Sequence, residues 1–451
     1  MSFCRVSLSV MPVLRAWRFQ LRSPRPAVTR ALRRELGACR WVWNRAVGEQ
    51  RERRARGEKH AGYAEMCRWL TNWRNRPETA WLREGSASAQ QQTLRRLDAA
   101  YRRFFEYLKQ RKAGIYCQRV GPPLIKGCGH DVGLRYPNPS HLEFDGERGR
   151  VKLPKVGWLR LRMSRPVEGE FRNVSITREG DRWFASVQTS VADVAPSPDL
   201  VPTLGIDLGI ANFAALSQRV DGRELVSPLD ALRRQAKRLA RYQRSVARKT
   251  KGSNNRRKAV DRLASLHRRI ARQRRDWLHQ LSTSIATEHS VVALEDLRVA
   301  SLSKSARGSA DKPGRNVKAK SRLNRAILDQ GWSEFRRQLE YKLAWRGGRL
   351  ILVEAAYTSR TCRICGFEDE GNRPRQDTFL CLACGHQEHA DIHAAKVILA
   401  RAIAPRTTAA GHAAAACGGV RKTNGRPRSS AAPSRQEPAQ ARSSACLPLP
   451  P

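Results

Sequence analysis

The sequence predicts a mixed α and β protein, with a helical block near the N-terminus, a small antiparallel β-barrel, and then an α/β region that a cysteine-rich segment interrupts. Apolar residues recur at helical spacing over 26–112, whereas short alternating strands with Gly and Pro fill 113–195. Two CxxC pairs stand late in the chain. A basic tail over 405–451, rich in Ala, Pro, Ser and Arg, is predicted to be disordered.

The N-terminal elements are predicted from periodicity. Residues 15–22 alternate between apolar and polar side chains, which is typical of a short strand. Apolar residues then recur every three or four positions over 26–56, 63–81 and 89–109, and arginines occupy many of the intervening positions. We therefore expect helices whose aromatic side chains form a core and whose arginines face outward.

The α/β region begins after a proline-containing linker. Residues 203–217 predict two strands joined at a glycine. Residues 231–275 contain many Lys and Arg and a single acid, Asp261, which predicts a helix pair with a phosphate-tracking face. The further elements expected are a strand over 291–294, a basic loop over 301–325, a helix over 324–345, a strand over 349–354 and a last helix over 392–403.

Four cysteines form the two CxxC pairs, with fifteen residues between the pairs: Cys362, Cys365, Cys381 and Cys384. This spacing predicts a zinc ribbon, in which two turns present four thiolates to one tetrahedral Zn²⁺. Gly366 and Gly385 directly follow the second cysteine of each pair, where backbone amides must fold back toward the sulfurs. His386 and His389 are alternative ligands, although four sulfurs already close a structural site.

The charge of the chain points to a polyanionic partner. Its 451 residues include 86 Lys and Arg against 40 Asp and Glu, which gives a formal net charge of +46. Such a charge binds phosphates through counterion release, so nucleic acid is the expected partner. No apolar run reaches the roughly 18 residues of a spanning helix, and no secretory signal is evident. The other cysteines are scattered, which fits reduced thiols, and we expect a cytoplasmic protein.

Acidic residues mark three of the predicted elements. Asp207 lies in the first strand of the α/β region, Glu295 ends the next apolar strand, and Asp391 precedes the last helix. Two-metal hydrolysis of a phosphodiester needs carboxylates that converge from separate elements, because Mg²⁺ prefers oxygen ligands. We interpret these three acids as the ligands of such a site. Asp296 and Asp230 are alternatives, and each acid taken alone could also be a turn or cap residue.

The order of these motifs resembles the TnpB (OrfB) family of insertion-sequence proteins, which are related to the type V CRISPR effectors. The stretch GIDLGIANFAALS at 205–217 is similar to the first RuvC-type motif, VVALEDL at 291–297 to the second and ADIHAAKVI at 390–398 to the third. TSRTCRICG at 358–366 and CLACGH at 381–386 are similar to the zinc ribbon of the family. The resemblance extends over residues 12–404.

The resemblance implies an RNA-guided DNA endonuclease of an insertion sequence. A guide RNA would pair with one strand of double-stranded target DNA, the protein would read a short flanking motif, and one site would cut both strands. Asp207, Glu295 and Asp391 would bind catalytic Mg²⁺, and the four cysteines would bind structural Zn²⁺. We expect a monomer that does not bind membranes.

The implied fold is an α/β RNase H-like (RuvC) nuclease domain with an inserted zinc ribbon, plus an N-terminal helical bundle and a small β-barrel. The implied domains are the first strand of a wedge-like barrel over 1–25, a helical recognition domain over 26–112, the rest of the barrel over 113–195, the RuvC-like nuclease domain over 203–357, the ribbon over 358–388, the last RuvC helix over 389–404 and the tail over 405–451.

Two features differ from the family pattern. The family usually has Asn two positions after the last aspartate, whereas this chain has His393, and residues 112–130 lack the usual basic Gly-Pro pattern. Three alternative functions also stay open: a nuclease-inactive, RNA-guided DNA-binding repressor, a transposase or resolvase of RuvC-like fold, and a basic RNA-binding scaffold without chemistry. The presence of all three acids favours cleavage.

Overall fold

The computed structural model describes residues 13–115, 117–127, 133–192, 201, 203–308 and 312–404. The predicted disordered tail over 405–451 lies outside these residues. In the part of the chain that is described, no helix is both long and apolar enough to cross a membrane.

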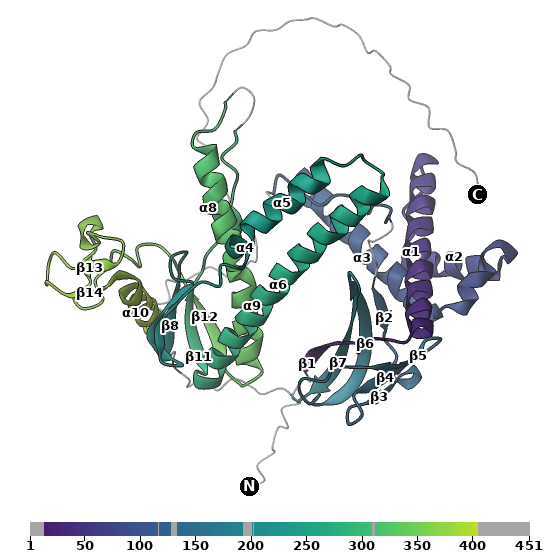
Figure 1. Ribbon diagram of the computed structural model, residues 1–451, viewed down its shortest axis with the longest axis horizontal. Helices are drawn as coiled ribbons and strands as arrows, with labels where there is room; N and C mark the ends of the chain where they lie inside the picture. Colours follow the sequence, from purple (N-terminus) through teal and green to yellow (C-terminus); the bar gives the residue numbers. More distant parts are fainter. Residues whose placement is uncertain are drawn as a thin grey trace, which may run out of the picture. The chain divides into compact units, whose positions relative to one another are not determined.

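The first strands form two antiparallel sheets around one core (Figure 1). Trp17, Phe19 and Leu159 are among the buried side chains that the two sheets contribute to this core. The four-stranded sheet has the order β1-β7-β6-β2, built from β1 (Val13–Gln20), β2 (Leu134–Tyr136), β6 (Glu170–Glu179) and β7 (Arg182–Val191). The three-stranded sheet consists of β3 (Glu143–Asp145), β4 (Arg150–Leu153) and β5 (Gly157–Arg160).

The predicted helical block consists of α1 (Pro26–Ala55), α2 (Tyr63–Asn75), a 3₁₀ helix (Pro77–Glu84) and α3 (Ala87–Lys112). The prediction of one helix over 63–81 was wrong: α2 ends at Asn75, and Pro77 begins the 3₁₀ turn, because a proline disfavours helical backbone in the residue before it. Trp43, Leu70 and Leu94 pack in the core of this block. Residues 103–121, which include the end of α3, fall in a separate compact unit.

A five-stranded mixed sheet forms the centre of the α/β region, in the order β10-β9-β8-β11-β12. Strands β10, β9 and β8 pair antiparallel, whereas β8, β11 and β12 run parallel. Strands β8 and β11 are almost wholly buried, as expected for apolar strands that are covered on both faces. The bounds are β8 (Leu204–Leu208), β9 (Ala214–Val220), β10 (Arg223–Val226), β11 (Val291–Glu295) and β12 (Arg349–Val353).

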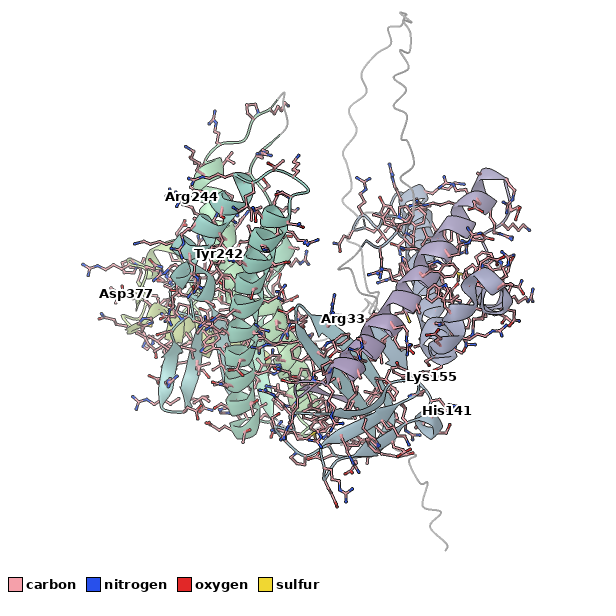
Figure 2. All side chains as sticks on the ribbon, turned by 45° about the vertical axis from the view of Figure 1, so that its right-hand side comes forward. Arg33, His141, Lys155, Tyr242, Arg244 and Asp377 are labelled. Atoms are coloured by element: carbon pink, nitrogen blue, oxygen red, sulfur yellow. The ribbon has the colours of Figure 1, made fainter. Side chains whose placement is uncertain are left out.

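The predicted basic helix pair corresponds to α5 (Ala236–Ala247) and α6 (Asn254–Glu288), which the short helix α4 (Ala231–Arg234) precedes. Ser253 caps α6 by accepting a hydrogen bond of 3.1 Å from the amide of Arg256. Side chains project from the outer face of α5, where Figure 2 labels Tyr242 and Arg244. Arg244 is exposed, and the guanidinium group of Arg238 donates to the hydroxyl of Tyr242 at 3.2 Å.

Two predictions for the segment after β11 were wrong. The stretch expected to be a loop over 301–325 contains the end of α7 (Val299–Leu302) and the start of α8 (Val317–Gln330). The helix expected over 324–345 is broken at Gly331, where α8 ends and α9 (Trp332–Ala344) begins. Gly331 has a φ of 79°, a left-handed conformation that favours glycine and interrupts a right-handed helix.

The last helix, α10 (Ala390–Ile403), packs against β8 and β9 (Figure 1). Gly205 of β8 allows this close contact, because a Cβ atom at position 205 would lie 2.1 Å from the carbonyl oxygen of Ala395. Between β12 and α10 the chain forms a small insertion that contains a 3₁₀ turn (Glu370–Asn372) and a hairpin of β13 (Thr378–Leu380) and β14 (Gln387–His389).

Candidate active site

Asp207 and Glu295 meet at one edge of the mixed sheet. Strands β8 and β11 are parallel neighbours, with Ile206 paired to Leu294, so the residues that follow lie side by side at the carboxyl ends of the two strands. Their carboxyl groups share a hydrogen bond. The structure thus places these two acids of the predicted site side by side.

Asp391 reaches the same edge from α10. It is the second residue of that helix, and its backbone amide donates to Nδ1 of His389 at 3.3 Å. Two side chains hold its carboxylate: Asn212 donates from Nδ2 to Oδ2 at 3.2 Å, and Arg373 donates to Oδ1 at 2.9 Å. Asn212 belongs to the turn between β8 and β9, so it links the strand that carries Asp207 to the helix that carries Asp391.

Asp391 lies close enough to Asp207, and Asp207 to Glu295, to disfavour the charged form of that neighbouring carboxyl group. Burial, followed by the charge of Asp391, raises the pKa of Asp207 to about 6, whereas the positive charge of Arg373 acts in the opposite direction. Burial, followed by the charge of Asp207, raises the pKa of Glu295 to about 8. The pair formed by Asp207 and Glu295 therefore holds a shared proton near neutral pH when no cation is present.

The ligand oxygens of the three acids do not all lie within 4.8 Å of one another. The described residues contain two groups of three or more Cys, His, Asp or Glu side chains whose ligand atoms all lie within 4.8 Å of one another. Neither group contains Asp207, Glu295 and Asp391 together. Oxygen ligands at one edge of a sheet nevertheless suit a hard divalent cation, whose charge would offset both the burial of these carboxyl groups and their mutual repulsion.

The raised pKa of Glu295 gives a prediction for stability. The folded chain keeps a proton on Glu295 up to about pH 8, whereas the unfolded chain releases it near the ordinary value of 4.5. The contribution of this proton to the free energy of unfolding is therefore complete at pH values below 4.5, and it is lost as the pH rises through the folded pKa of about 8. Without added Mg²⁺, we expect the unfolding midpoint of the wild type to fall relative to that of Glu295→Gln as the pH increases over this window. The measurement is differential scanning fluorimetry at several pH values. If the unfolding midpoints of the wild type and Glu295→Gln change equally with pH, the raised pKa of Glu295 is contradicted.

The alternative acids are engaged elsewhere. Asp296 pairs with Arg336 at 2.6 Å, and its backbone amide donates to the carbonyl oxygen of Val353. Asp230 precedes α4 and pairs with Arg233 at 3.1 Å. Because successive side chains along a strand point to opposite faces, Asp296 is not expected to share the orientation of Glu295, and its pairing with Arg336 is consistent with this.

The four cysteines form a compact cluster, with all four sulfur atoms within 4.8 Å of one another. The sulfurs of Cys362 and Cys384 are 3.7 Å apart, and those of Cys365 and Cys381 are 3.5 Å apart. Four thiolates around one Zn²⁺ at about 2.3 Å lie about 3.8 Å from one another, so the spacing fits a tetrahedral site. Both expected glycine turns are present, since Gly366 has a φ of 75° and Gly385 a φ of 70°.

Sequence reasoning missed two residues of the insertion. Asn372 is fully buried, donates to the carbonyl oxygens of Arg360 and Phe367, and accepts from the amide of Leu382, so it joins the two cysteine turns. Arg373 follows it and reaches Asp391. No local pattern identified either residue, because an isolated polar residue in a short loop carries no periodic signal.

The histidines near the cysteines have separate environments. His389 caps α10, as the contact with Asp391 shows. His386 lies near Glu388 and His393. His393, the residue that departs from the family pattern, is fully buried and stacks on Phe379 with ring centroids 3.6 Å apart.

Comparison with known families gives three matches along the chain. Residues 186–306 match the OrfB family of IS605-type elements, described as a probable transposase. Residues 11–59 match the helix-turn-helix domain of the same group, and residues 332–398 match the TNB domain of Cas12f1-like proteins.

Two curated relatives cover nearly the whole chain. A protein of Escherichia coli (strain K12) named "Putative RNA-guided DNA endonuclease InsQ" is 40% identical over 408 residues, which are 90% of this chain and 95% of that protein. A Streptomyces pristinaespiralis protein with the same description is 34% identical over 417 residues, or 91% and 93% of the two chains. Among solved structures, a Cas12f1 complex with single-guide RNA and target DNA covers 83% of each chain at 15% identity, with a TM-score of 0.49.

Proposed function

The chain belongs to the TnpB (OrfB) family of insertion-sequence proteins, and from this premise we propose that it is an RNA-guided endonuclease that cuts double-stranded DNA beside a short flanking motif. The observation that carries the proposal is the hydrogen-bonded pair of Asp207 and Glu295, with the charge of Asp391 on α10 acting on Asp207. Two relatives that cover nearly the whole chain are named "Putative RNA-guided DNA endonuclease", which supports the proposal.

The proposed catalytic domain has an RNase H-like (RuvC) fold. Its support is the order of the mixed sheet, with three antiparallel strands followed by two that run parallel to β8. In open sheets of this kind, sites lie at the carboxyl ends of parallel strands, which is where Asp207 and Glu295 are found.

In the proposed mechanism, Asp207, Glu295 and Asp391 supply oxygen ligands to Mg²⁺. When bound, the cations supply the positive charge that stabilises the attacking and leaving oxygens of phosphodiester hydrolysis. Asp207 and Glu295 must give up the proton they share before they can both act as ligands. Asn212 and Arg373 orient Asp391 through one oxygen each and thus restrict its position relative to β8.

The four cysteines are proposed to hold a structural Zn²⁺. Their spacing supports a closed tetrahedral site, and Asn372 joins the two turns from which the sulfurs project. Because Arg373 follows Asn372 directly, the metal would also hold the loop from which Arg373 reaches Asp391.

Guide RNA and target DNA are the proposed partners. A protein that leaves sequence reading to base pairing needs a positively charged surface along the nucleic acid, and the net charge of +46 satisfies this need. The outer face of α5 and α6, with its exposed arginines, is a candidate part of that surface. We further propose that the helical block and the two N-terminal sheets contact the RNA–DNA duplex and the flanking motif.

The test is to purify the full chain together with RNA transcribed from the adjoining transposon end. We expect a defined RNA to copurify, and we expect Mg²⁺ to permit cleavage of a matched double-stranded DNA but not of one mismatched to the guide. Binding of the matched DNA without cleavage would instead indicate a repressor. Strand joining that needs no RNA would indicate a transposase or resolvase.

A further inference from the structure

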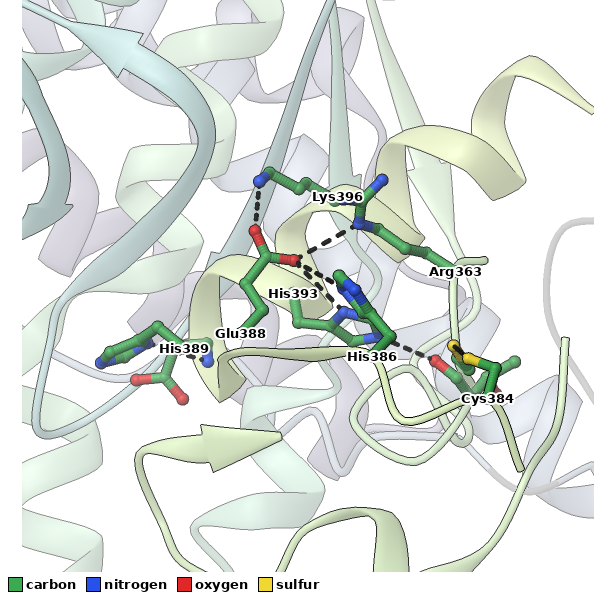
Figure 3. Close-up of polar contacts among 10 residues, drawn as sticks. Arg363, Cys384, His386, Glu388, His389, His393 and Lys396 are labelled. Carbon is green, nitrogen blue, oxygen red and sulfur yellow. Dashed lines mark hydrogen bonds and ion pairs between the residues drawn. The ribbon is translucent and has the colours of Figure 1, made fainter. Parts of the chain in front are cut away.

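A second group of metal-ligating side chains lies between β14 and α10. His386 and Glu388 come from the segment around β14, and His393 comes from the first turns of α10. Their ligand atoms lie within 4.8 Å of one another. Figure 3 shows both imidazole rings beside the carboxylate of Glu388, whereas His389 lies apart.

Hydrogen bonds within the protein do not satisfy all the nitrogen atoms of this group. Nε2 of His393 is 3.1 Å from the carbonyl oxygen of Thr361, and its Nδ1 is 3.4 Å from Oε2 of Glu388. A neutral imidazole has one N–H group, so it can donate to only one of these two acceptors. When it donates to Thr361, the lone pair of Nδ1 faces the carboxylate oxygen directly.

His386 adds a second unsatisfied nitrogen. Its Nε2 atom is buried and has no hydrogen-bond partner among the described residues, and it lies 3.5 Å from the same Oε2 atom of Glu388. Two imidazole nitrogens and one carboxylate oxygen therefore face a common space. A buried nitrogen without a partner is costly, and a cation in this space would satisfy all three atoms.

The spacing of these atoms fits a metal ion better than it fits hydrogen bonds. Ligand atoms that bind Zn²⁺ tetrahedrally at 2.0–2.1 Å lie about 3.4 Å from one another. The two nitrogen-to-oxygen distances are 3.4 Å and 3.5 Å. The contact with Thr361 also matches metal-binding histidines, which usually donate their second N–H to a carbonyl or carboxylate oxygen that fixes the ring.

Two cations already contact Glu388, and both leave room for a metal ion. Lys396 pairs with Oε1, the oxygen that does not face the histidines. Arg363 approaches Oε2 at 3.3 Å from Nε, and its side chain is 33% exposed, so it can turn toward solvent. Four thiolates around one Zn²⁺ carry a net negative charge, and this neighbouring charge offsets the added cation.

We propose that His386, Glu388 and His393 form a second metal site, which binds a borderline divalent transition ion such as Zn²⁺ and leaves a fourth position for water. Imidazole and carboxylate ligands suit this class of ion. The bound ion would link β14 to the start of α10, separately from the four cysteines and from the acids of the sheet. The proposal does not depend on nuclease activity.

The test is to measure the zinc content of the full chain by mass spectrometry. The protein is loaded with zinc in excess Mg²⁺, so that the acids of β8 and β11 do not retain zinc, and unbound metal is then removed. We expect two zinc ions per chain in the wild type and one in Glu388→Gln and His393→Asn. His267→Asn, at an exposed position of α6, is the matched control and should keep two. One zinc ion in the wild type, or two in both variants, would overturn the proposal.

A second readout separates loss of the site from loss of folding. When Co²⁺ replaces zinc, the thiolate cluster gives a sulfur-to-cobalt charge-transfer band that the histidine site lacks. Glu388→Gln and His393→Asn should lose one cobalt ion and keep this band. If His393→Asn loses the band because the buried ring is needed for folding, His386→Asn decides the outcome, because the side chain of His386 is 22% exposed. Two cobalt ions in a folded His386→Asn variant would contradict the second site.

Discussion

Replacement of Asp207 by asparagine is expected to slow cleavage of a matched double-stranded DNA at least about a thousandfold, because metal-assisted stabilisation of the transition state contributes several kcal/mol and each 1.36 kcal/mol changes a rate tenfold. The amide keeps the shape of the side chain in the buried strand β8 but is a weak ligand for Mg²⁺. Guide RNA should stay bound, because the proposed RNA-binding surfaces lie elsewhere. The measurement is single-turnover cleavage by the RNA-loaded protein.

Glu295→Gln and Asp391→Asn should have effects of similar size, because their carboxyl groups act as a unit with Asp207. Asp296→Asn is the matched control: Asp296 follows Glu295 directly, but its carboxylate pairs with Arg336. We expect this control to cut DNA at nearly the wild-type rate. An Asp207→Asn variant that cuts within about tenfold of the wild type would show that the three acids are not the metal ligands.

The second large effect is expected for Cys362→Ser. Cys362 is 1% exposed and lies in the core of the insertion with Cys381 and Phe379. Zinc binding is coupled to folding in such small domains, where the metal contributes about 10–16 kcal/mol. We therefore expect the variant to lose the structural zinc ion, to unfold at a lower temperature and to lose cleavage. The loss of activity follows from the loop that carries Arg373, which contacts Asp391.

Cys67→Ser is the matched control for this experiment. Cys67 is a half-buried residue of α2 that packs in the core of the helical block. This substitution should leave the zinc content unchanged. Zinc analysis, thermal unfolding and cleavage are to be measured on the same preparations. A Cys362→Ser protein that lacks this zinc ion and yet folds and cuts DNA normally would rule out the structural role of the cluster.

The motifs of the candidate site could be predicted from the sequence because each combines a short apolar strand with one chemically distinctive residue. The strands that carry Asp207 and Glu295 were found in this way, and the two glycines after the cysteine pairs have the backbone conformation that was expected. These signals are local, since they depend on side-chain type and on spacing of a few residues.

The features that were missed depend on tertiary contacts. The break at Gly331 lies within an otherwise helical pattern, and one glycine inside such a pattern is a weak signal. Arg373 acquires its partner only when the insertion folds beside α10. His393 follows Asp391 by two positions and departs from the family pattern, but its nitrogens lie near Thr361 and Glu388, on the side of α10 that faces the insertion.

The absence of a side chain at Gly205 limits how this protein can diverge. Every replacement adds at least one carbon atom, which would collide with the backbone of Ala395 rather than with a side chain that could move aside. The terminal helix would then shift away from the sheet, and Asp391 would shift with it. One methyl group at this position would therefore separate the acids on which the proposed hydrolysis depends.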